Sequence, residues 1–278
     1  MEIIRTHSPE GFKQLDTAAL RRDFLVSGLF TPGQIVLRYW EVDRTIIGGA
    51  VPLAEPLELT ATKELLAATY FCERREVGIV NLGGPGAVET DGTRHALGKL
   101  DSLYIGRGVK TVKFTSNKPA KPAQFYIVSY PAHTAYPTKR VKLAQAQVLE
   151  LGTQETANRR KLCKLLVPGL VESCQLVLGV TLLESGSVWN SMPCHTHERR
   201  SEVYFYFDVP AKSVVFHFLG RPREETRHLV VRNGEAALSP SWSTHFGAGT
   251  TAYGFVWAMG GENQEFTDMD AAPTEELK

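Results

Sequence analysis

The sequence predicts an all-β protein made of two tandem jelly-roll β-barrels with a few short helices. Short segments rich in Val, Ile, Phe and Tyr recur along the chain, and residues that favour tight turns separate them. This spacing is typical of a sandwich or jelly roll. The predicted strands are Glu76–Leu82, Leu100–Ile105, Gln124–Tyr130, Leu176–Leu182, Glu202–Phe207, Ser213–Leu219, His228–Val231 and Gly254–Trp257. The turns include Gly83-Gly84-Pro85-Gly86, Asp91-Gly92, Gly106-Arg107-Gly108, Gly220-Arg221-Pro222 and Asn233-Gly234.

Helical patterns are scarce in this chain. The two best candidates for helices are Ser8–Leu25 and Thr60–Thr69. In the second candidate, Thr60 is predicted to cap the N-terminus and Glu64 to support the first turn.

A weak internal repeat favours two related barrels. The run Cys72-Glu73-Arg74-Arg75-Glu76-Val77-Gly78-Ile79 resembles His197-Glu198-Arg199-Arg200-Ser201-Glu202-Val203-Tyr204-Phe205, with one residue inserted. Duplication explains the match, because a repeated unit keeps its strand pattern, whereas the alternative is chance. We therefore expect an N-terminal barrel over residues 1–135, a connection over residues 136–165 and a C-terminal barrel over residues 166–278.

Length and charge limit the classes of function. With 278 residues and 43% hydrophobic residues, the chain can bury a large core. Its 31 basic and 30 acidic residues give a formal net charge of +1, which leaves no excess of positive charge for nucleic acid or an anionic membrane. A small molecule is therefore the expected partner.

The N-terminal residues and the cysteines indicate a cytoplasmic protein. The first residues contain no apolar leader segment, and no stretch approaches the roughly 18 apolar residues of a membrane helix. The four cysteines are widely spaced and form no C-x-x-C pair, so reduced, buried thiols are expected. They are Cys72, Cys163, Cys174 and Cys194.

Four residues of the C-terminal half predict a metal site. His195 and His197 alternate on a predicted strand, and alternate side chains of a strand share a face. Glu202 returns to that face after a short charged turn, and His245 begins a later strand. Two surface histidines would be the simpler interpretation, but the chain has only 8 histidines and these occur in register with a carboxylate. Three imidazoles and one carboxylate suit a divalent ion.

The neighbours of these residues have other predicted roles. Cys194 is expected to point away from the metal and to pack, and Glu198 is expected to be solvated or paired with an arginine. Tyr204 and Tyr206 share the face of Glu202, where they either fill the core or contact a substrate. His217 is the one spare histidine that could be a further ligand.

The internal repeat predicts that the first barrel lacks a metal. In that alignment, Tyr70 and Cys72 stand at the two histidine positions, and Val109 stands near the position of His245. Phenol and aliphatic side chains cannot build a site of three imidazoles and a carboxylate.

The metal pattern resembles the two motifs of the cupin superfamily. These motifs are a glycine followed by His-x-His-x4-Glu, and Gly-x5-Pro followed by His, matched here by Gly186, by Gly234 with Pro240, and by the four residues above. Trp242 stands where the second motif usually has Gly, and no Asn follows His245 at the usual spacing. These departures concern the shape of the turn and leave the ligands intact.

Longer runs resemble one family within that superfamily, the 4-deoxy-L-threo-5-hexosulose-uronate ketol-isomerases, also called 5-keto-4-deoxyuronate isomerases. The similarity extends over essentially the whole chain. Its most specific parts are Asn190-Ser191-Met192-Pro193-Cys194-His195-Thr196-His197-Glu198-Arg199-Arg200, Glu202-Val203-Tyr204-Phe205-Tyr206-Phe207, Ser239-Pro240-Ser241-Trp242-Ser243-Thr244-His245, Gly261-Glu262-Asn263-Gln264 and Pro131-Ala132-His133-Thr134-Ala135-Tyr136-Pro137-Thr138-Lys139.

The resemblance implies a two-barrel cupin fold, one zinc ion per subunit, a homo-hexamer and a role in pectin breakdown. The implied reaction converts 5-dehydro-4-deoxy-D-glucuronate into 3-deoxy-D-glycero-2,5-hexodiulosonate. The implied metal ligands are His195, His197, Glu202 and His245. The ligand set alone also suits Mn, Fe or Ni.

The sequence leaves the catalytic residues open. Glu198, Tyr204, Tyr206 and a metal-bound hydroxide are all candidates for the base of an enediol route, and a hydride shift is the other route. The substrate carboxylate is expected to bind a cation. The unranked candidates for that cation are Arg160, Lys164, Arg199 and Arg200.

Three other functions remain as alternatives to this isomerase. One is 5-deoxy-glucuronate isomerase of inositol breakdown, a related cupin. The others are an iron dioxygenase and a cupin that only binds a sugar acid. A metal-containing regulator of transcription is disfavoured, because the sequence shows no helix-turn-helix or basic segment.

Overall fold

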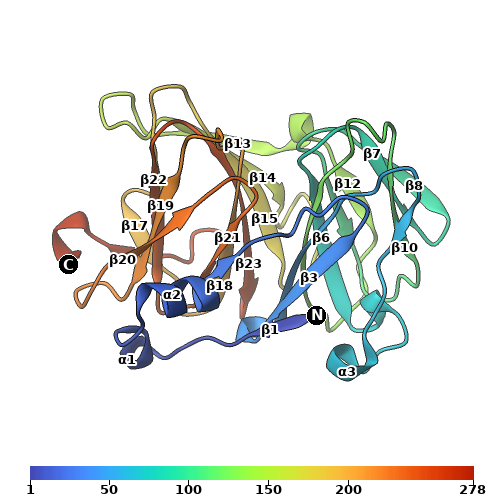
Figure 1. The fold of residues 1–278 in the computed structure, drawn as a ribbon, viewed down its shortest axis with the longest axis horizontal. Coiled ribbons are helices and arrows are strands. Elements are labelled where there is room, and N and C mark those ends of the chain that lie inside the picture. The colour runs from blue at the N-terminus through green and yellow to red at the C-terminus, as the bar shows by residue number, and fades with distance from the viewer. The chain divides into compact units, whose positions relative to one another are not determined.

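The computed structural model describes residues 1–278, which form two compact units. The first unit consists of Met1–Ile4, Gly28–Gln147 and Lys164–Leu178, and the second consists of Arg5–Ser27, Val148–Cys163 and Gly179–Lys278. Strands dominate both units, and the helices are short (Figure 1). The predicted all-β fold with a few short helices is therefore confirmed.

The first unit is built on a seven-stranded and a four-stranded sheet. The larger sheet has the order β1 (Glu2–Ile4), β3 (Ile35–Trp40), β4 (Thr45–Ala50), β11 (Phe125–Pro131), β6 (Arg75–Asn81), β9 (Ser102–Ile105) and β12 (Lys139–Val141). The smaller has the order β5 (Leu57–Glu58), β10 (Val112–Ser116), β7 (Gly86–Thr90) and β8 (Thr93–Leu97). Its helical turns are η1 (Val42–Arg44), α3 (Lys63–Leu66), η2 (Phe71–Glu73) and η3 (Leu143–Gln145).

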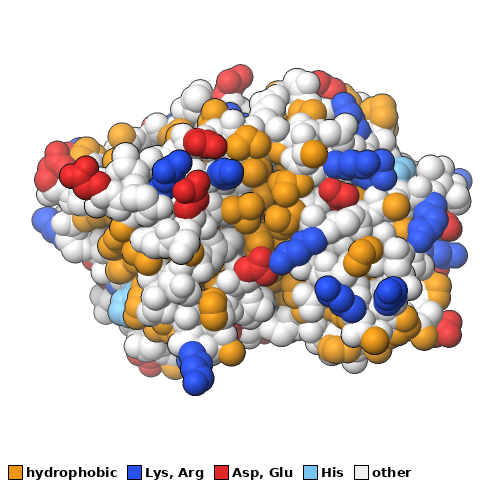
Figure 2. All heavy atoms as spheres, turned by 90° about the horizontal axis from the view of Figure 1, so that it is seen from above, with side chains coloured by type: hydrophobic (Ala, Val, Ile, Leu, Met, Phe, Trp, Pro, Cys, Tyr) orange, Lys and Arg blue, Asp and Glu red, His pale blue; other side chains and the backbone are white.

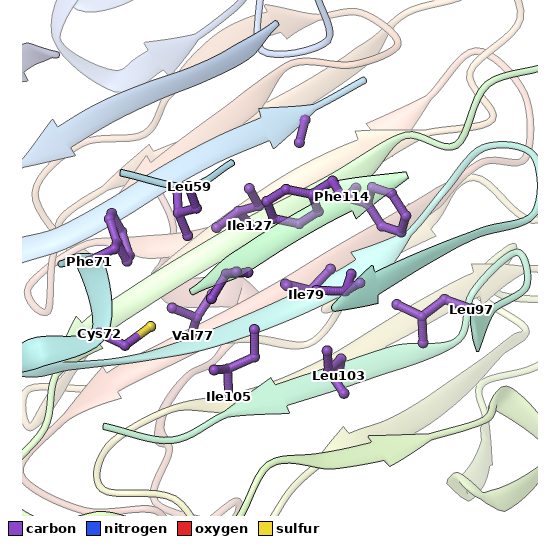
Figure 3. Close-up of a cluster of buried hydrophobic side chains, with 14 of the residues drawn as sticks. Leu59, Phe71, Cys72, Val77, Ile79, Leu97, Leu103, Ile105, Phe114 and Ile127 are labelled. Atoms are coloured by element: carbon purple, nitrogen blue, oxygen red, sulfur yellow. The ribbon is translucent and has the colours of Figure 1, made fainter. Parts of the chain in front are cut away.

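Apolar side chains from both sheets fill the interior of the first unit. Ile79 and Ile127 come from the larger sheet, and Phe114 and Leu97 come from the smaller one (Figure 3). Cys72 lies in the same cluster, and burial raises the pKa of its thiol to about 12. The strands of the two sheets therefore enclose a hydrophobic core, and burial of its apolar surface stabilises the unit.

The second unit repeats this arrangement of sheets. Its larger sheet has the order β13 (Gln147–Leu151), β14 (Arg160–Leu166), β15 (Val177–Leu183), β23 (Gly254–Gly261), β18 (Arg200–Phe207), β21 (Ala236–Ser239) and β2 (Leu25–Val26). Its four-stranded sheet has the order β16 (Trp189–Asn190), β22 (Thr244–Gly249), β19 (Val215–Gly220) and β20 (Arg227–Val231). A third sheet pairs β17 (Cys194–Thr196) with β24 (Asp270–Ala272), and the helices are α1 (Pro9–Phe12), α2 (Thr17–Phe24) and η4 (Thr274–Glu276).

The internal repeat has a structural counterpart in two buried arginines. Arg75 begins β6 and donates to the carbonyl oxygens of Arg44 and Ser129, whereas Arg200 begins β18 and donates to those of Glu265 and Asp268. These two arginines are aligned whether or not a residue is inserted after them, and without an insertion Ser201 corresponds to Glu76. The position of Glu202 then corresponds to Val77, which lies in the apolar cluster of the first unit.

The division of the chain differs from the predicted boundaries at 1–135, 136–165 and 166–278. The N-terminal residues 5–27 belong to the second unit, because β2 pairs with β21 and Arg227 donates to the carbonyl oxygens of Phe12 and Leu15. The predicted connection contains strands β12 and β13 and the start of β14. A segment therefore belongs to the unit whose strands it pairs with, even when it lies far from that unit in the sequence.

All eight predicted strands are present, with ends that shift by a few residues. The predicted helix Ser8–Leu25 is divided into α1 and α2, because Asp16 caps a new helix by accepting from the backbone N–H of Ala19 at 2.7 Å. The predicted helix Thr60–Thr69 is only the single turn α3. Its N-cap is Thr62 rather than Thr60, and that side chain makes no capping hydrogen bond.

Charged side chains of both signs are interspersed on the face drawn in Figure 2. None of the short helices has the length and apolar composition that a membrane-spanning helix requires. All four cysteines are free thiols, and three of them are buried.

Candidate metal centre

The structure brings the four predicted ligands together inside the second unit. His195 lies on β17, His197 follows that strand, Glu202 lies on β18, and His245 lies on β22. One nitrogen or oxygen of each side chain lies within 4.8 Å of all the others. Three of the four side chains are buried, and His195 is half-buried. Such a group can bind a metal ion.

The predicted reason for the convergence is only partly right. Strand β17 ends at Thr196, so His197 does not continue the alternation of a regular strand. The imidazole rings of His195 and His197 nevertheless lie with centroids 4.9 Å apart. The pairing of His195 with Ala271 on β24 fixes the strand, and the turn after it directs His197 toward Glu202.

Close contacts between the ligand atoms define the centre. Glu202 Oε2 lies 2.8 Å from His245 Nε2 and 3.5 Å from His197 Nε2. The Nε2 atoms of His195 and His245 lie only 3.2 Å apart. Three imidazoles and one buried carboxylate thus place four possible metal-binding atoms within 4.8 Å of one another.

Burial keeps His195 and His197 neutral. It lowers the pKa of His195 to about 2, with further contributions from His245 and Arg200. Burial lowers the pKa of His197 as well, and His245 and His195 add to the effect. A neutral imidazole keeps a lone pair for a metal, so this environment favours coordination over protonation.

The second ring nitrogen of His245 is held by the turn before β22. Its Nδ1 lies 3.2 Å from the Ser243 carbonyl oxygen and 3.1 Å from the Ser239 hydroxyl. A carbonyl oxygen only accepts, so Nδ1 carries a proton, and in the neutral ring Nε2 on the side of Glu202 then has the lone pair. This hydrogen bond fixes the tautomer that a metal ligand requires.

A pocket of about 410 Å³ adjoins the four-residue group and is lined by His195, His197 and Glu202. Most of its wall is apolar, with side chains from β14, β23 and the segment before β24. These apolar residues include Leu162, Phe255, Trp257, Met259, Phe266 and Met269. A small molecule in this pocket would reach the four-residue group while it contacts a mostly apolar wall.

The structure separates the candidate catalytic side chains. Tyr204 lines the pocket, and its hydroxyl lies 2.7 Å from that of Ser191. Its ring also packs 5.4 Å from the ring of His245. Tyr206 instead pairs with the Nδ1 of His217 at 2.7 Å, outside the pocket lining, and Glu198 is exposed. Tyr204 is therefore the one of these three that can touch a ligand.

The remaining predicted residues lie apart from the ligand group. His217 is fully buried, and burial lowers its pKa to about 3, but it is not part of the group. Cys194 packs against Phe246 and Ala272, as expected, but it also lines the pocket beside the four-residue group. Trp242 lies edge-on to Phe12, with ring centroids 5.3 Å apart, so the residue that replaces the motif glycine attaches α1 to the second unit.

The sequence did not predict that residues 262–269, between β23 and β24, form part of the wall of the pocket. Arg199 binds the carboxylates of Asp268 and Asp270, and Arg200 donates to the carbonyl oxygens of Glu265 and Asp268. Through these contacts the segment is held where Phe266, Thr267 and Met269 line the pocket. The sequence shows two nearby acidic residues, Asp268 and Asp270, which could have indicated a partner for an arginine. No local pattern shows that their partner is Arg199.

Residues 28–275 match the KduI/IolB family. The chain belongs to this family. The protein named 4-deoxy-L-threo-5-hexosulose-uronate ketol-isomerase from Lachnoclostridium phytofermentans is 51% identical over 278 residues, which cover 100% of both chains. Proteins of the same name from Burkholderia cenocepacia and Dickeya dadantii are 50% and 46% identical over 279 residues, again with 100% of both chains covered.

Solved structures show that this KduI/IolB family protein has a cupin-like fold. An IolB-like protein from Salmonella typhimurium LT2 superposes with a TM-score of 0.70 at 14% identity and covers 87% of this chain and 94% of its own. Oxalate decarboxylase of Bacillus subtilis, described with Mn(II) centres, gives a TM-score of 0.56 at 10% identity, with coverages of 87% and 79%. The predicted family and the predicted fold are both confirmed.

Proposed function

We propose that His195, His197, Glu202 and His245 hold one divalent metal ion per chain, and that this ion is zinc. The convergence of three imidazoles and one buried carboxylate carries the proposal, and burial keeps two of the imidazoles, His195 and His197, neutral. An uncompensated carboxylate inside a protein is costly, and a divalent cation at this position would offset that cost. Zinc is preferred on the family resemblance, while Mn, Fe and Ni also suit the ligands.

Metal analysis of single variants tests this centre. We expect His197→Ala and His245→Ala to lose most of the bound metal while they stay folded, because the apolar contacts of the sheets lie elsewhere. The matched control is His228→Ala, which removes an exposed histidine on β20. Full metal content in His197→Ala or His245→Ala would show that the ligands are assigned wrongly.

We further propose that the protein is a ketol-isomerase that interconverts 5-dehydro-4-deoxy-D-glucuronate and 3-deoxy-D-glycero-2,5-hexodiulosonate, a reaction of pectin breakdown. Relatives that are about half identical over the full length carry the name of this isomerase. The ligand group beside a mostly apolar pocket suits a small uronate.

The bound metal would supply Lewis-acid polarisation of the substrate carbonyl. The chain itself contributes binding, exclusion of water and hydrogen bonding. Phe255, Trp257 and Met259 shield the reacting carbons from water. Tyr204 remains protonated, because burial and then the charge of Glu202 raise its pKa well above the ordinary value. Its hydroxyl, held by Ser191, can donate a hydrogen bond to a substrate oxygen.

The rival substrate is 5-deoxy-glucuronate, since the family also includes IolB proteins. The IolB-like structure shares only 14% identity with this chain, against about 50% for the uronate ketol-isomerases, which favours the first substrate. Product identification by NMR after incubation with each compound, without nicotinamide or oxygen, distinguishes the two. Rapid turnover of 5-deoxy-glucuronate alone, or oxygen uptake, would overturn the proposed activity.

We also propose that the protein is a cytoplasmic homo-hexamer, which rests on the family resemblance. Light scattering after size exclusion measures the assembly, and we expect six times the mass of one chain. Fractionation of cells tests the location, and recovery of the protein outside the cytoplasm would contradict it.

A further inference from the structure

Four cations were candidates to bind the substrate carboxylate, and the structure separates them. Arg160, the first residue of β14, lines the pocket beside the ligand group. Arg199 is engaged by Asp268 and Asp270, and Arg200 is buried against carbonyl oxygens. Lys164 lies further along β14 and does not line the pocket. Arg160 is thus the only cation of the pocket lining.

The guanidinium of Arg160 has no acidic partner. Its one hydrogen bond within the protein runs from Nη1 to the carbonyl oxygen of Asn158, at 2.7 Å. A guanidinium has five N–H donors, so most of its donors remain available. The only carboxylate that lines the pocket is Glu202, which belongs to the ligand group. A half-buried cation without a counter-charge favours an anion from outside the chain.

The groups around Arg160 also lack a negative charge that could pair with its guanidinium. Burial lowers its pKa, and no carboxylate is among the groups that interact electrostatically with it, which are the phenols of Tyr204 and Tyr253. Tyr204 is also the residue whose ring packs on His245, so it lies near both the guanidinium and the ligand group. The guanidinium and the ligand group therefore face the same small space.

The position of β14 in the sheet separates Arg160 from the ligand group. Two strands, β15 and β23, lie between β14 and β18, which carries Glu202. Three strand spacings of about 4.8 Å place the two backbones roughly 14 Å apart. Long side chains shorten this gap, and a small elongated molecule can bridge the rest. The wall along that path is apolar, with Phe255 and Trp257 on β23.

We propose that Arg160 binds the carboxylate of the uronate and thereby sets which end of the substrate reaches the ligand group. With the carboxylate on Arg160, the C1 aldehyde and the C2 hydroxyl face the histidines, and the C4 methylene lies along the apolar wall. A guanidinium can hold a carboxylate with two parallel hydrogen bonds, which fixes orientation as well as position. This assignment rests on the proposed isomerase function.

The test compares two variants and two substrates. Arg160→Gln removes the charge, and Arg160→Lys keeps a point charge without the fork of donors. The adjacent Arg159→Gln is the matched control, because Arg159 is half-exposed, pairs with Glu184 and does not line the pocket. Each protein is assayed with the uronate and with its uronamide, which has the same carbon chain without the charge. Metal content and thermal unfolding are measured for all four proteins.

We expect Arg160→Gln to lower kcat/KM for the uronate by about 10- to 100-fold, the range for a lost hydrogen bond to a charged group. Turnover of the uronamide should change little, so the preference of the wild-type protein for the acid should disappear. Arg160→Lys should retain part of that preference, and Arg159→Gln should retain all of it. Metal content should be the same in all four proteins.

Two results would overturn the assignment, and they are distinguishable. If Arg160→Gln keeps the wild-type preference for the acid over the amide, or loses activity on both equally, Arg160 does not bind the carboxylate. If the wild-type protein with its metal turns over neither compound, the proposed function itself is wrong and this assignment fails with it. The ratio of acid to amide is measured within each protein, so a partly unfolded variant still gives a decisive value.

Discussion

Acidification should destabilise the metal-free protein through its buried histidines, and His217 allows this to be measured. The side chain of His217 is fully buried on β19, and burial lowers its pKa from 6.5 to about 3. In the unfolded chain the imidazole takes up a proton below pH 6.5, whereas in the folded protein it remains neutral. The unfolded state therefore binds more protons, and stability must fall as the pH falls below 6.5.

The size of the effect follows from this difference in pKa. Well below the pKa of the unfolded chain, each such histidine lowers the free energy of unfolding by about 1.4 kcal/mol for every pH unit. Between pH 7 and pH 5, His217 alone should lower the free energy of unfolding by about 2 kcal/mol. The loss should continue toward the folded pKa near 3.

Urea unfolding of chelated protein at several pH values between 7 and 5 measures this slope. Between pH 7 and pH 5 the variant His217→Phe should show an average slope smaller by about 1 kcal/mol per pH unit, because His217 is only partly protonated in the unfolded chain near pH 6.5. Its absolute stability also changes, because the hydroxyl of Tyr206 loses its partner, so the slopes are compared and not the stabilities. The control His228→Phe replaces an exposed imidazole and should keep the wild-type slope. An unchanged slope in His217→Phe would refute the reasoning.

Three further outcomes follow from single contacts. Tyr206→Phe should lower the free energy of unfolding by about 1 to 3 kcal/mol in denaturant titrations, because it leaves a ring nitrogen of His217 without its partner. Arg199→Ala should raise KM and speed proteolysis of the segment before β24 at unchanged metal content, because two carboxylates lose their cation. The thiol of Cys72, whose pKa burial raises to about 12, should resist alkylation at pH 8 in the folded protein and react once the chain is unfolded in urea.

Features that depend on residues close in the sequence were predictable. The strands were found because apolar and β-branched residues cluster between turn residues. The sequence predicted that His195, His197, Glu202 and His245 would come together, and the structure shows this convergence, whereas their role as metal ligands stays a prediction. The convergence of His195, His197 and Glu202 needs only one turn between two strands, so the local sequence almost determines it.

Features that depend on distant pairing were not predictable. The N-terminal residues join the second unit because Leu25 pairs with Ala237, and no local pattern specifies that partner. The choice among Arg160, Arg199 and Arg200 also required the structure. All three have the same side chain, and only their neighbours show that two are satisfied by the protein while one is not.

Titration of metal into chelated protein tests the central claim most directly. Activity on 5-dehydro-4-deoxy-D-glucuronate is measured as zinc is added in steps, with bound metal determined at each step. If one centre made by His195, His197, Glu202 and His245 carries the reaction, activity should rise in proportion to bound metal and level off at one ion per chain. Full turnover by the metal-free protein, or a plateau that requires two ions per chain, would contradict the account.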